Sequence, residues 1–192
     1  KLRPLNAYGW SKNIFDMWAV TQTMKGNHPP QWAGLKFFNV YGPRETHKGP
    51  QRSVAHQLFE QANRGETIKL FKSYHPDYQD GGQLRDFVFV DDCCNVIEWL
   101  RQSPAVSGIF NVGTGKARSF ADIANSLGTA IKQQPKVEFI EMPTQIRQHY
   151  QYFTQADVTR LCEAGYQNAF TSLEQGIANY VSFLKENQDF YN

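Results

Sequence analysis

Apolar residues recur every three or four positions in several stretches of the chain, a spacing typical of helices with one buried face. The clearest stretch covers residues 8–25, and a Gly-Asn-His-Pro-Pro run at 26–30 ends it. Its apolar side chains are those of Trp10, Ile14, Phe15, Trp18 and Met24. Further helices are predicted over residues 53–63, 91–101, 119–132, 154–165 and 171–187.

Capping residues support the starts of these helices, because a short polar side chain there binds a free backbone amide. The predicted starts are Asp91 with Asp92, Ser119 with Asp122, Thr154, and Thr171 with Glu174. Gly65 and Gly165 are expected to end two of the helices.

Short apolar and β-branched runs lie between the helices and predict strands. They cover residues 34–40, 67–71, 86–90, 109–112 and 137–140. Strands that alternate with helices indicate an α/β fold with parallel strands. Because no repeat, low-complexity tract or clear linker interrupts the pattern, it does not divide the chain into domains.

Composition narrows the function classes. Of the 192 residues, 41% are hydrophobic, enough for a core, and the net charge of +2 provides no strong basic field for nucleic acid. No apolar run approaches the roughly 18 residues of a membrane span, and the first residues lack an apolar signal segment. Cys93, Cys94 and Cys162 have neither disulfide nor zinc spacing, so we expect buried or structural thiols in a reducing cytoplasm.

Tyr8 and Lys12 stand four residues apart on the first predicted helix and so share a face. An ammonium group beside a phenol favours the phenolate. Such a tyrosine can take a proton from an alcohol while hydride leaves the same carbon. An ordinary surface pair gives the same spacing by chance, so both interpretations stay open.

Single polar side chains mark two other strand ends. Asn39 lies at the carboxyl end of a predicted strand, where open α/β sheets bind ligands, and Lys48 lies in the next loop. Lys48 suits a phosphate clamp or a base, and a solvated loop charge is the alternative. Arg85 suits phosphate recognition, and an ion pair with Asp86 or Asp91 is the alternative.

Two segments remain ambiguous or misleading. The aromatic residues at Tyr150 and 152–153 either stack on a nucleotide or belong to the core, and periodicity does not decide between these roles. The run 113–118 nearly spells the dinucleotide fingerprint G-x-G-x-x-G, but Arg118 occupies the third glycine position. We therefore expect a structural turn between a strand and a helix there.

Several segments together resemble the extended short-chain dehydrogenase/reductase superfamily in their order and spacing. They are Tyr8-x-x-x-Lys12, the run Asn39-Val40-Tyr41-Gly42-Pro43-Arg44, and the run Arg85-Asp86-Phe87-Val88-Phe89-Val90-Asp91-Asp92. Within that superfamily the chain is similar to the heptose epimerases. The segments that carry this closer resemblance are 45–49, 110–115 and 150–157.

The resemblance implies a Rossmann-like sheet with helices and a smaller substrate-binding domain, of which this chain would be the C-terminal portion. Residues 1–49 would be the last part of the NADP-binding domain. Residues 50–192 would mainly form the substrate-binding domain, with residues around 86–115 returning to the Rossmann-like sheet. A glycine-rich turn and a serine or threonine at the reacting oxygen, which the superfamily has, are not found. We therefore expect poor NADP binding and little turnover by this chain alone.

The resemblance also implies roles for individual residues. Tyr8 and Lys48 would be acid/base groups on opposite faces of one sugar carbon, and Lys12 would be the electrostatic partner of Tyr8. The implied cofactor contacts are Tyr8, Lys12, Val40 and Lys48. The implied substrate contacts are Asn39, Gln57, Phe71, Lys72, Ser73, Arg85 and Tyr150. Pro50 and Gln57 depart from the residues common in relatives, so their substrate contacts are open.

The implied reaction is epimerisation of ADP-heptose at C6, by transient oxidation with NADP and reduction on the other face, for lipopolysaccharide precursors. The implied assembly is a homo-oligomer in the cytoplasm, with no nucleic-acid or membrane partner. Two alternatives stay open: another nucleotide-sugar epimerase or dehydratase of the superfamily, and a non-catalytic module that binds a nucleotide-sugar. Retention of Tyr8, Lys12 and Lys48 together favours catalysis, because a pure binder needs no proton carriers.

Overall fold

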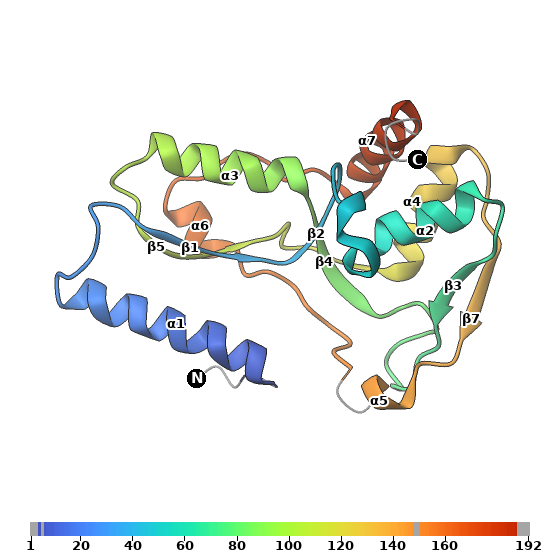
Figure 1. Cartoon of the computed structure of the whole chain (residues 1–192), viewed down its shortest axis with the longest axis horizontal. Coiled ribbons are helices and arrows are strands. Elements are labelled where there is room, and N and C mark those ends of the chain that lie inside the picture. The colour runs from blue at the N-terminus through green and yellow to red at the C-terminus, as the bar shows by residue number, and fades with distance from the viewer. Residues whose placement is uncertain (1–3, 5, 148–149, 188–192) are drawn as a thin grey trace.

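The structure is a computed structural model that describes residue 4, residues 6–147 and residues 150–187. Helices and strands alternate along the chain, which confirms the α/β class (Figure 1). The helices are α1 (Ala7–Met24), α2 (Val54–Asn63), α3 (Val90–Gln102), α4 (Phe120–Ile131), α5 (Thr144–Arg147), α6 (Thr159–Glu163) and α7 (Leu173–Glu186), with a 3-10 turn η1 (Thr46–Gln51). The strands are β1 (Ala33–Phe37), β2 (Asn39–Tyr41), β3 (Ile68–Phe71), β4 (Leu84–Phe89), β5 (Gly108–Val112), β6 (Ala117–Ser119) and β7 (Val137–Ile140).

The strands pair in separate groups that follow one another along the molecule. β1 pairs with β5, β2 with β4, and β3 with β7, each in parallel, while β6 adds to β4 in antiparallel orientation. The strand predicted over 34–40 is therefore divided at Phe38, whose amide still binds Val112 while Asn39 is already paired with Phe87. The chain thus changes partner strand where Asn39 and Val40 stand.

Two hydrophobic clusters hold these groups together, and β4 contributes to both because its side chains alternate between its faces. Phe87 and Phe89 pack in a cluster with α2, α4 and α7. Val88 packs in a second cluster with α3, β5 and α6. The strand that carries Arg85 is therefore fixed from both faces.

The carboxylate of Asp86 is fully buried beside the β5–β6 turn. It accepts hydrogen bonds from the Thr114 amide and hydroxyl at 2.7 and 2.8 Å, from the Gly115 amide at 2.9 Å, and from the Ala156 amide at 3.0 Å. These four donors come from two distant segments. The turn at 113–118 thus has the structural role expected for it, although it leads through the unpredicted strand β6 before α4 begins.

Two predicted helix caps are wrong, because the side chains concerned bind each other. The buried carboxylate of Asp92 accepts hydrogen bonds from the Thr171 amide at 2.8 Å and hydroxyl at 2.9 Å. Helix α3 starts after Phe89 without a side-chain cap, and α7 is capped by Ser172, whose hydroxyl accepts from the Gln175 amide. The capping box of Ser119 and Asp122 at α4 is confirmed.

The helix predicted to begin at Thr154 is also wrong in its first part. Residues 152–154 run beside β4, and the Thr154 amide donates to the Leu84 carbonyl at 3.1 Å. Since this amide binds a strand, helix α6 begins only at Thr159, and Gly165 follows its end as predicted. Of the cysteines only Cys93 is buried, where burial raises the pKa of its thiol to about 12, while Cys94 and Cys162 are exposed.

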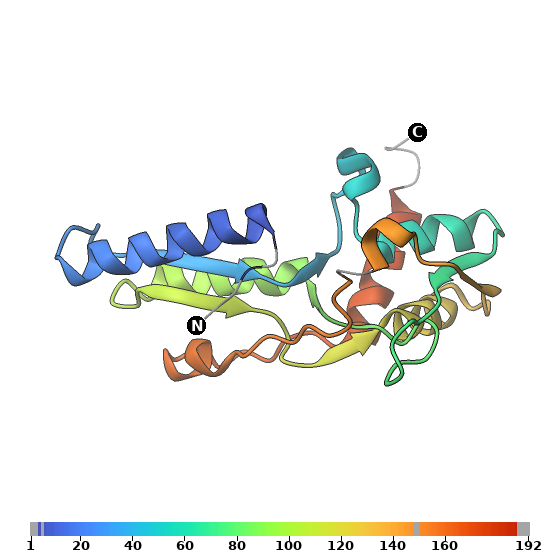
Figure 2. The same ribbon diagram turned by 90° about the horizontal axis from the view of Figure 1, so that it is seen from below.

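Helix α1 lies along the β1–β5 pair, on the side opposite α3 (Figures 1 and 2). Its half-buried positions are small or polar, and Asp16 among them pairs with Lys36 of β1. Its large apolar side chains are exposed, namely those of Tyr8, Trp10, Ile14, Phe15, Met17, Trp18, Val20 and Met24. Within the described residues, no helix is both long and apolar enough to cross a membrane.

Candidate functional site

Two pockets open next to each other where β2, the η1 turn and α2 meet. The strand-end pocket, about 340 Å³, is lined by residues 38–41, 45, 48, 51–55 and 87. The aromatic pocket, about 220 Å³, is lined by residues 54, 57, 58, 61, 69–71, 83, 120 and 150. Val54 lines both pockets, so the two pockets are adjacent.

The strand-end pocket brings together Asn39, Val40 and Lys48. Asn39 and Val40 stand on β2, and the chain then turns sharply at Gly42, where φ is 144°. A side chain at Gly42 would overlap Val90, so only glycine allows this turn to pack on β4 and α3. The turn leads the chain into η1, whose exposed Lys48 lines the same pocket.

The aromatic pocket brings together Gln57, Phe71 and Tyr150, and Arg85 lies against it. The rings of Phe71 and Tyr150 meet edge to face with centroids 6.4 Å apart. The Arg85 guanidinium carbon lies 5.2 Å from the Tyr150 ring centroid and 5.8 Å from that of Phe120. Burial raises the pKa of Tyr150 and lowers that of Arg85, so this cation stands where solvent screens it poorly.

This geometry differs from the ion pair considered for Arg85, since Asp86 instead binds backbone amides. Arg85 donates to the Leu84 carbonyl at 2.8 Å and otherwise stacks on aromatic rings. A guanidinium fork beside rings suits a ligand that has both a phosphate and a planar base.

Lys72 and Ser73 lie just beyond Phe71 and outside the lining of both pockets. The exposed Lys72 amine pairs with Glu141 at 2.8 Å. The Ser73 amide donates to Asp80 at 2.7 Å, and its hydroxyl donates to the His75 carbonyl. Both residues therefore shape the loop that follows the pocket.

Tyr8 and Lys12 share one face of α1 as predicted, with the Lys12 amine 5.1 Å from the centroid of the Tyr8 ring. The structure does not bring them into the lining of either pocket, and Tyr8 is 72% exposed. Both views show the N-terminal end of α1, which carries the two residues, turned toward the end of β1 that leads into β2 (Figures 1 and 2).

Sequence reasoning missed residues that complete the two pockets. Val54 joins them, Phe120 closes the aromatic pocket, and Glu45 and Arg52 frame the Lys48 turn. The opposite charges of Glu45 and Arg52, which flank Lys48 in the sequence, were a signal that this loop is structured. Phe120 carried no such signal, because it comes from a distant helix.

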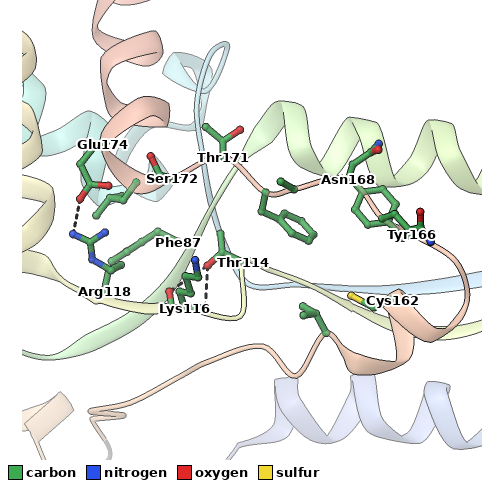
Figure 3. Close-up of a pocket in the computed structure, with 15 residues that line it drawn as sticks. Phe87, Thr114, Lys116, Arg118, Cys162, Tyr166, Asn168, Thr171, Ser172 and Glu174 are labelled. Atoms are coloured by element: carbon green, nitrogen blue, oxygen red, sulfur yellow. Dashed lines mark hydrogen bonds and ion pairs between the residues drawn. The ribbon is translucent and has the colours of Figure 1, made fainter.

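A larger pocket of about 830 Å³ lies beside the β5–β6 turn and the start of α7 (Figure 3). Its main cation, Arg118, pairs with Glu174 at 2.6 Å and with Asp122 at 3.1 Å. The residues singled out from the sequence as functional are not among its lining. Both carboxylates that pair with Arg118 therefore compete with any ligand for this guanidinium.

Comparison with known proteins gives concordant similarities. The sequence model of the NAD dependent epimerase/dehydratase family matches residues 1–113. An ADP-L-glycero-D-manno-heptose-6-epimerase of Nitratidesulfovibrio vulgaris is 48% identical over 181 residues, covering 94% of this chain and 55% of the relative. One of Fusobacterium nucleatum is 45% identical over 197 residues, covering 100% of this chain and 58% of the relative.

A solved structure gives the same similarity in three dimensions. The crystal structure of Helicobacter pylori ADP-L-glycero-D-manno-heptose-6-epimerase superposes with a TM-score of 0.76 at 30% identity. The match covers 95% of this chain and 52% of that one. The chain thus spans about half the length of the relatives it matches.

Proposed function

The chain belongs to the NAD dependent epimerase/dehydratase family, and from this premise we propose that it serves an epimerase that inverts C6 of ADP-D-glycero-D-manno-heptose. The names of the relatives at 45% and 48% identity support this substrate. The observation that carries the proposal is the pair of pockets joined at Val54, one with an amine and an amide, the other with rings and a guanidinium.

The two pockets suit the two ends of an ADP-sugar. The heptose is proposed to lie between Asn39 and Lys48, where amide and amine can bind its hydroxyl groups. The adenine is proposed to lie against Phe71 and Tyr150, since edge-to-face rings offer a stacking surface. Arg85 is proposed to bind the diphosphate, because its fork matches phosphate oxygens in a poorly screened site.

The cofactor is proposed to be NADP, held at its nicotinamide end by Tyr8, Lys12, Val40 and Lys48. The strand-end pocket suits a nicotinamide ring, because Val40 offers an apolar contact there while the amide of Asn39 and the amine of Lys48 offer hydrogen-bond donors. A nicotinamide bound there supplies a hydride acceptor that later returns the hydride.

The side chains of this chain are proposed to move protons on the two faces of C6. As the C6–H bond breaks and its electron pair leaves with the hydride, Tyr8 takes the proton of the C6 hydroxyl, and a ketone forms. After the sugar presents its other face and the hydride returns, Lys48 gives the ketone oxygen its proton. Each epimer thus meets a different acid/base group, as inversion requires.

We also propose that the protein acts as a homo-oligomer and that residues 1–49 belong to its cofactor-binding domain. The exposed apolar side chains of α1 support the first proposal. The changes of strand pairing at Phe38 and around β4 support a boundary near the Lys48 turn.

The test is the substrate specificity of the full coding product that contains this chain. We expect it to convert ADP-D-glycero-D-manno-heptose into its L-glycero epimer, measured by proton NMR of the sugar, with NADP preferred over NAD. Conversion of a UDP-sugar in its place would contradict the heptose proposal. Equal turnover with NAD would contradict the NADP preference only.

A further inference from the structure

The turn that carries Lys48 is tied to the core through the carboxylate of Glu45, which is 4% exposed. One oxygen, Oε2, accepts from the Ser53 amide at 2.6 Å. The other, Oε1, accepts from the Ser53 hydroxyl at 2.6 Å and from the Tyr180 hydroxyl of α7 at 2.9 Å. The Lys48 amide in turn donates to the Glu45 carbonyl at 3.0 Å.

The other end of the turn is held by Arg52. Its backbone amide and its Nε both donate to the Gly49 carbonyl, at 3.2 and 2.8 Å. Its NH1 donates to Glu60 at 2.6 Å and lies 3.1 Å from Nε2 of His56. Residues on both sides of Lys48 are therefore fixed by side chains of α2 and α7.

These contacts form a chain of hydrogen bonds with one direction. Nε2 of His56 lies 3.1 Å from Arg52 NH1 and 3.5 Å from the Glu60 carboxylate. Because Arg52 can only donate, we assign Nε2 as the acceptor and place the hydrogen on Nδ1. Nδ1 lies 2.6 Å from the Tyr180 oxygen and donates a hydrogen bond to it. The Tyr180 hydroxyl in turn donates a hydrogen bond to Glu45. Burial lowers the pKa of His56, which favours the neutral ring that this order needs.

We propose that the chain Arg52–His56–Tyr180–Glu45 positions Lys48 over the strand-end pocket, and that His56 and Tyr180 are positioning residues for it. This inference rests on the proposed acid/base role of Lys48. A proton carrier acts only within hydrogen-bond reach of its target, so a loosened turn lowers the rate.

The first test measures amide hydrogen exchange in the full chain. Tyr180→Phe removes the hydroxyl and leaves the ring, so we expect exchange across residues 46–53 to become about fivefold faster. Tyr166→Phe is the matched control, because it removes a buried hydroxyl in the other hydrophobic cluster. We expect it to leave exchange at 46–53 unchanged.

A conservative pair separates positioning from general loss of stability. In His56→Asn the amide nitrogen takes the place of Nδ1 and can still donate to Tyr180. In His56→Leu no donor remains. We expect slow exchange across 46–53 to be largely kept in the first variant and lost in the second. Equal exchange in both variants would overturn the proposal.

The second test measures kinetics in the full coding product. Tyr180→Phe should lower kcat about tenfold and change KM for the ADP-sugar less than twofold, because the four hydrogen-bonded residues do not line the aromatic pocket. Faster exchange with an unchanged kcat would overturn the positioning role. Absence of epimerase activity in the unsubstituted protein would overturn the proposed function instead. The exchange results would still decide whether the hydrogen bonds of Arg52, His56, Tyr180 and Glu45 hold the turn.

Discussion

Three buried carboxylates among the described residues bind backbone amides, and two of them bind amides from distant segments. Glu45 binds the Ser53 amide, Asp86 binds amides of the β5–β6 turn and of Ala156, and Asp92 binds the Thr171 amide. A buried carboxylate that accepts such hydrogen bonds fixes the segments that donate them. At the scale of the residue, these three side chains set the path of the loops around the site.

Lys48 provides the most direct residue-scale test of the proposed chemistry. Lys48→Met keeps much of the length of the side chain and removes the amine, so kcat of the full coding product should fall by about 10²- to 10⁴-fold. Binding of ADP, measured by calorimetry, should persist because the aromatic pocket is intact. Lys25→Met, which alters an exposed lysine at the end of α1, is the control and should retain full activity. A kcat within threefold of the unsubstituted protein would argue against an acid/base role for Lys48.

His56 should make the stability of the fold depend on pH. Its pKa in the folded chain lies below the ordinary value of 6.5, with burial as the main cause. As the pH drops below about 6.5, the ring therefore takes up a proton more readily in the unfolded chain than in the folded chain. The free energy of unfolding consequently decreases as the pH decreases. Glu60 and Glu45 oppose this shift, while Arg52 adds to it.

Urea denaturation at pH 7.5 and 5.5 measures this dependence. We expect the free energy of unfolding to fall by at most about 1.4 kcal/mol per pH unit across the window through this one group. The decrease should be smaller in His56→Phe, which has no titrating ring, and unchanged in His28→Gln, at an exposed position. An identical slope in His56→Phe would refute the assignment.

At the scale of the element, α7 packs closely against Tyr41 of β2. Gly176 lies near the N-terminal end of α7, and a side chain at this position would overlap the hydroxyl of Tyr41 and lie 3.4 Å from Cβ of Phe89. The buried Tyr41 hydroxyl reaches the Leu173 carbonyl of the same helix at 3.5 Å. Helix α7, which carries Tyr180, thus packs against strand β2, which carries Asn39.

Gly176→Ala should therefore destabilise the protein, although alanine favours an exposed helix by about 1 kcal/mol over glycine. We expect a loss of about 1–3 kcal/mol in urea denaturation, because the new methyl group overpacks a filled core. Adding Tyr41→Phe removes the oxygen concerned and should recover most of the loss. A double-mutant cycle with no coupling between the two positions would contradict this packing account.

At the scale of the whole molecule, α1 presents its apolar side chains outward. Its half-buried positions are small or polar and recur at helical spacing, namely Gly9, Asn13, Asp16, Ala19, Gln22 and Thr23. An exposed apolar surface of this kind is typical of an interface. The pattern that predicted a buried helix from the sequence is therefore not satisfied by the described residues alone.

We predict from this surface that the 192-residue chain self-associates. We expect sedimentation velocity at micromolar concentration to detect species larger than a monomer. Replacing Phe15 and Trp18, whose rings lie 5.6 Å apart, with arginine should shift the distribution toward monomer. Arginine at Ile97, an exposed position of α3, is the control and should not change it. A monomer at all concentrations would contradict the homo-oligomer proposal.

The sequence by itself determined the features that a few neighbouring residues decide. Helical spacing and the capping box of Ser119 and Asp122 located α1, α2 and α4, because the interactions involved span three or four positions. Asn39 and Lys48 line one pocket, and they belong to a strand and to the loop that follows it, so their proximity could be expected from the sequence.

Only the tertiary structure decided which distant groups bind one another. Asp92 and Thr171 each had the pattern of a cap, yet they pair across 79 positions, and the Thr154 amide binds β4 rather than a helix. Tyr180 reaches Glu45 across 135 positions. Local spacing cannot specify such partners, because a polar group buried by packing binds whichever donor or acceptor the fold brings beside it.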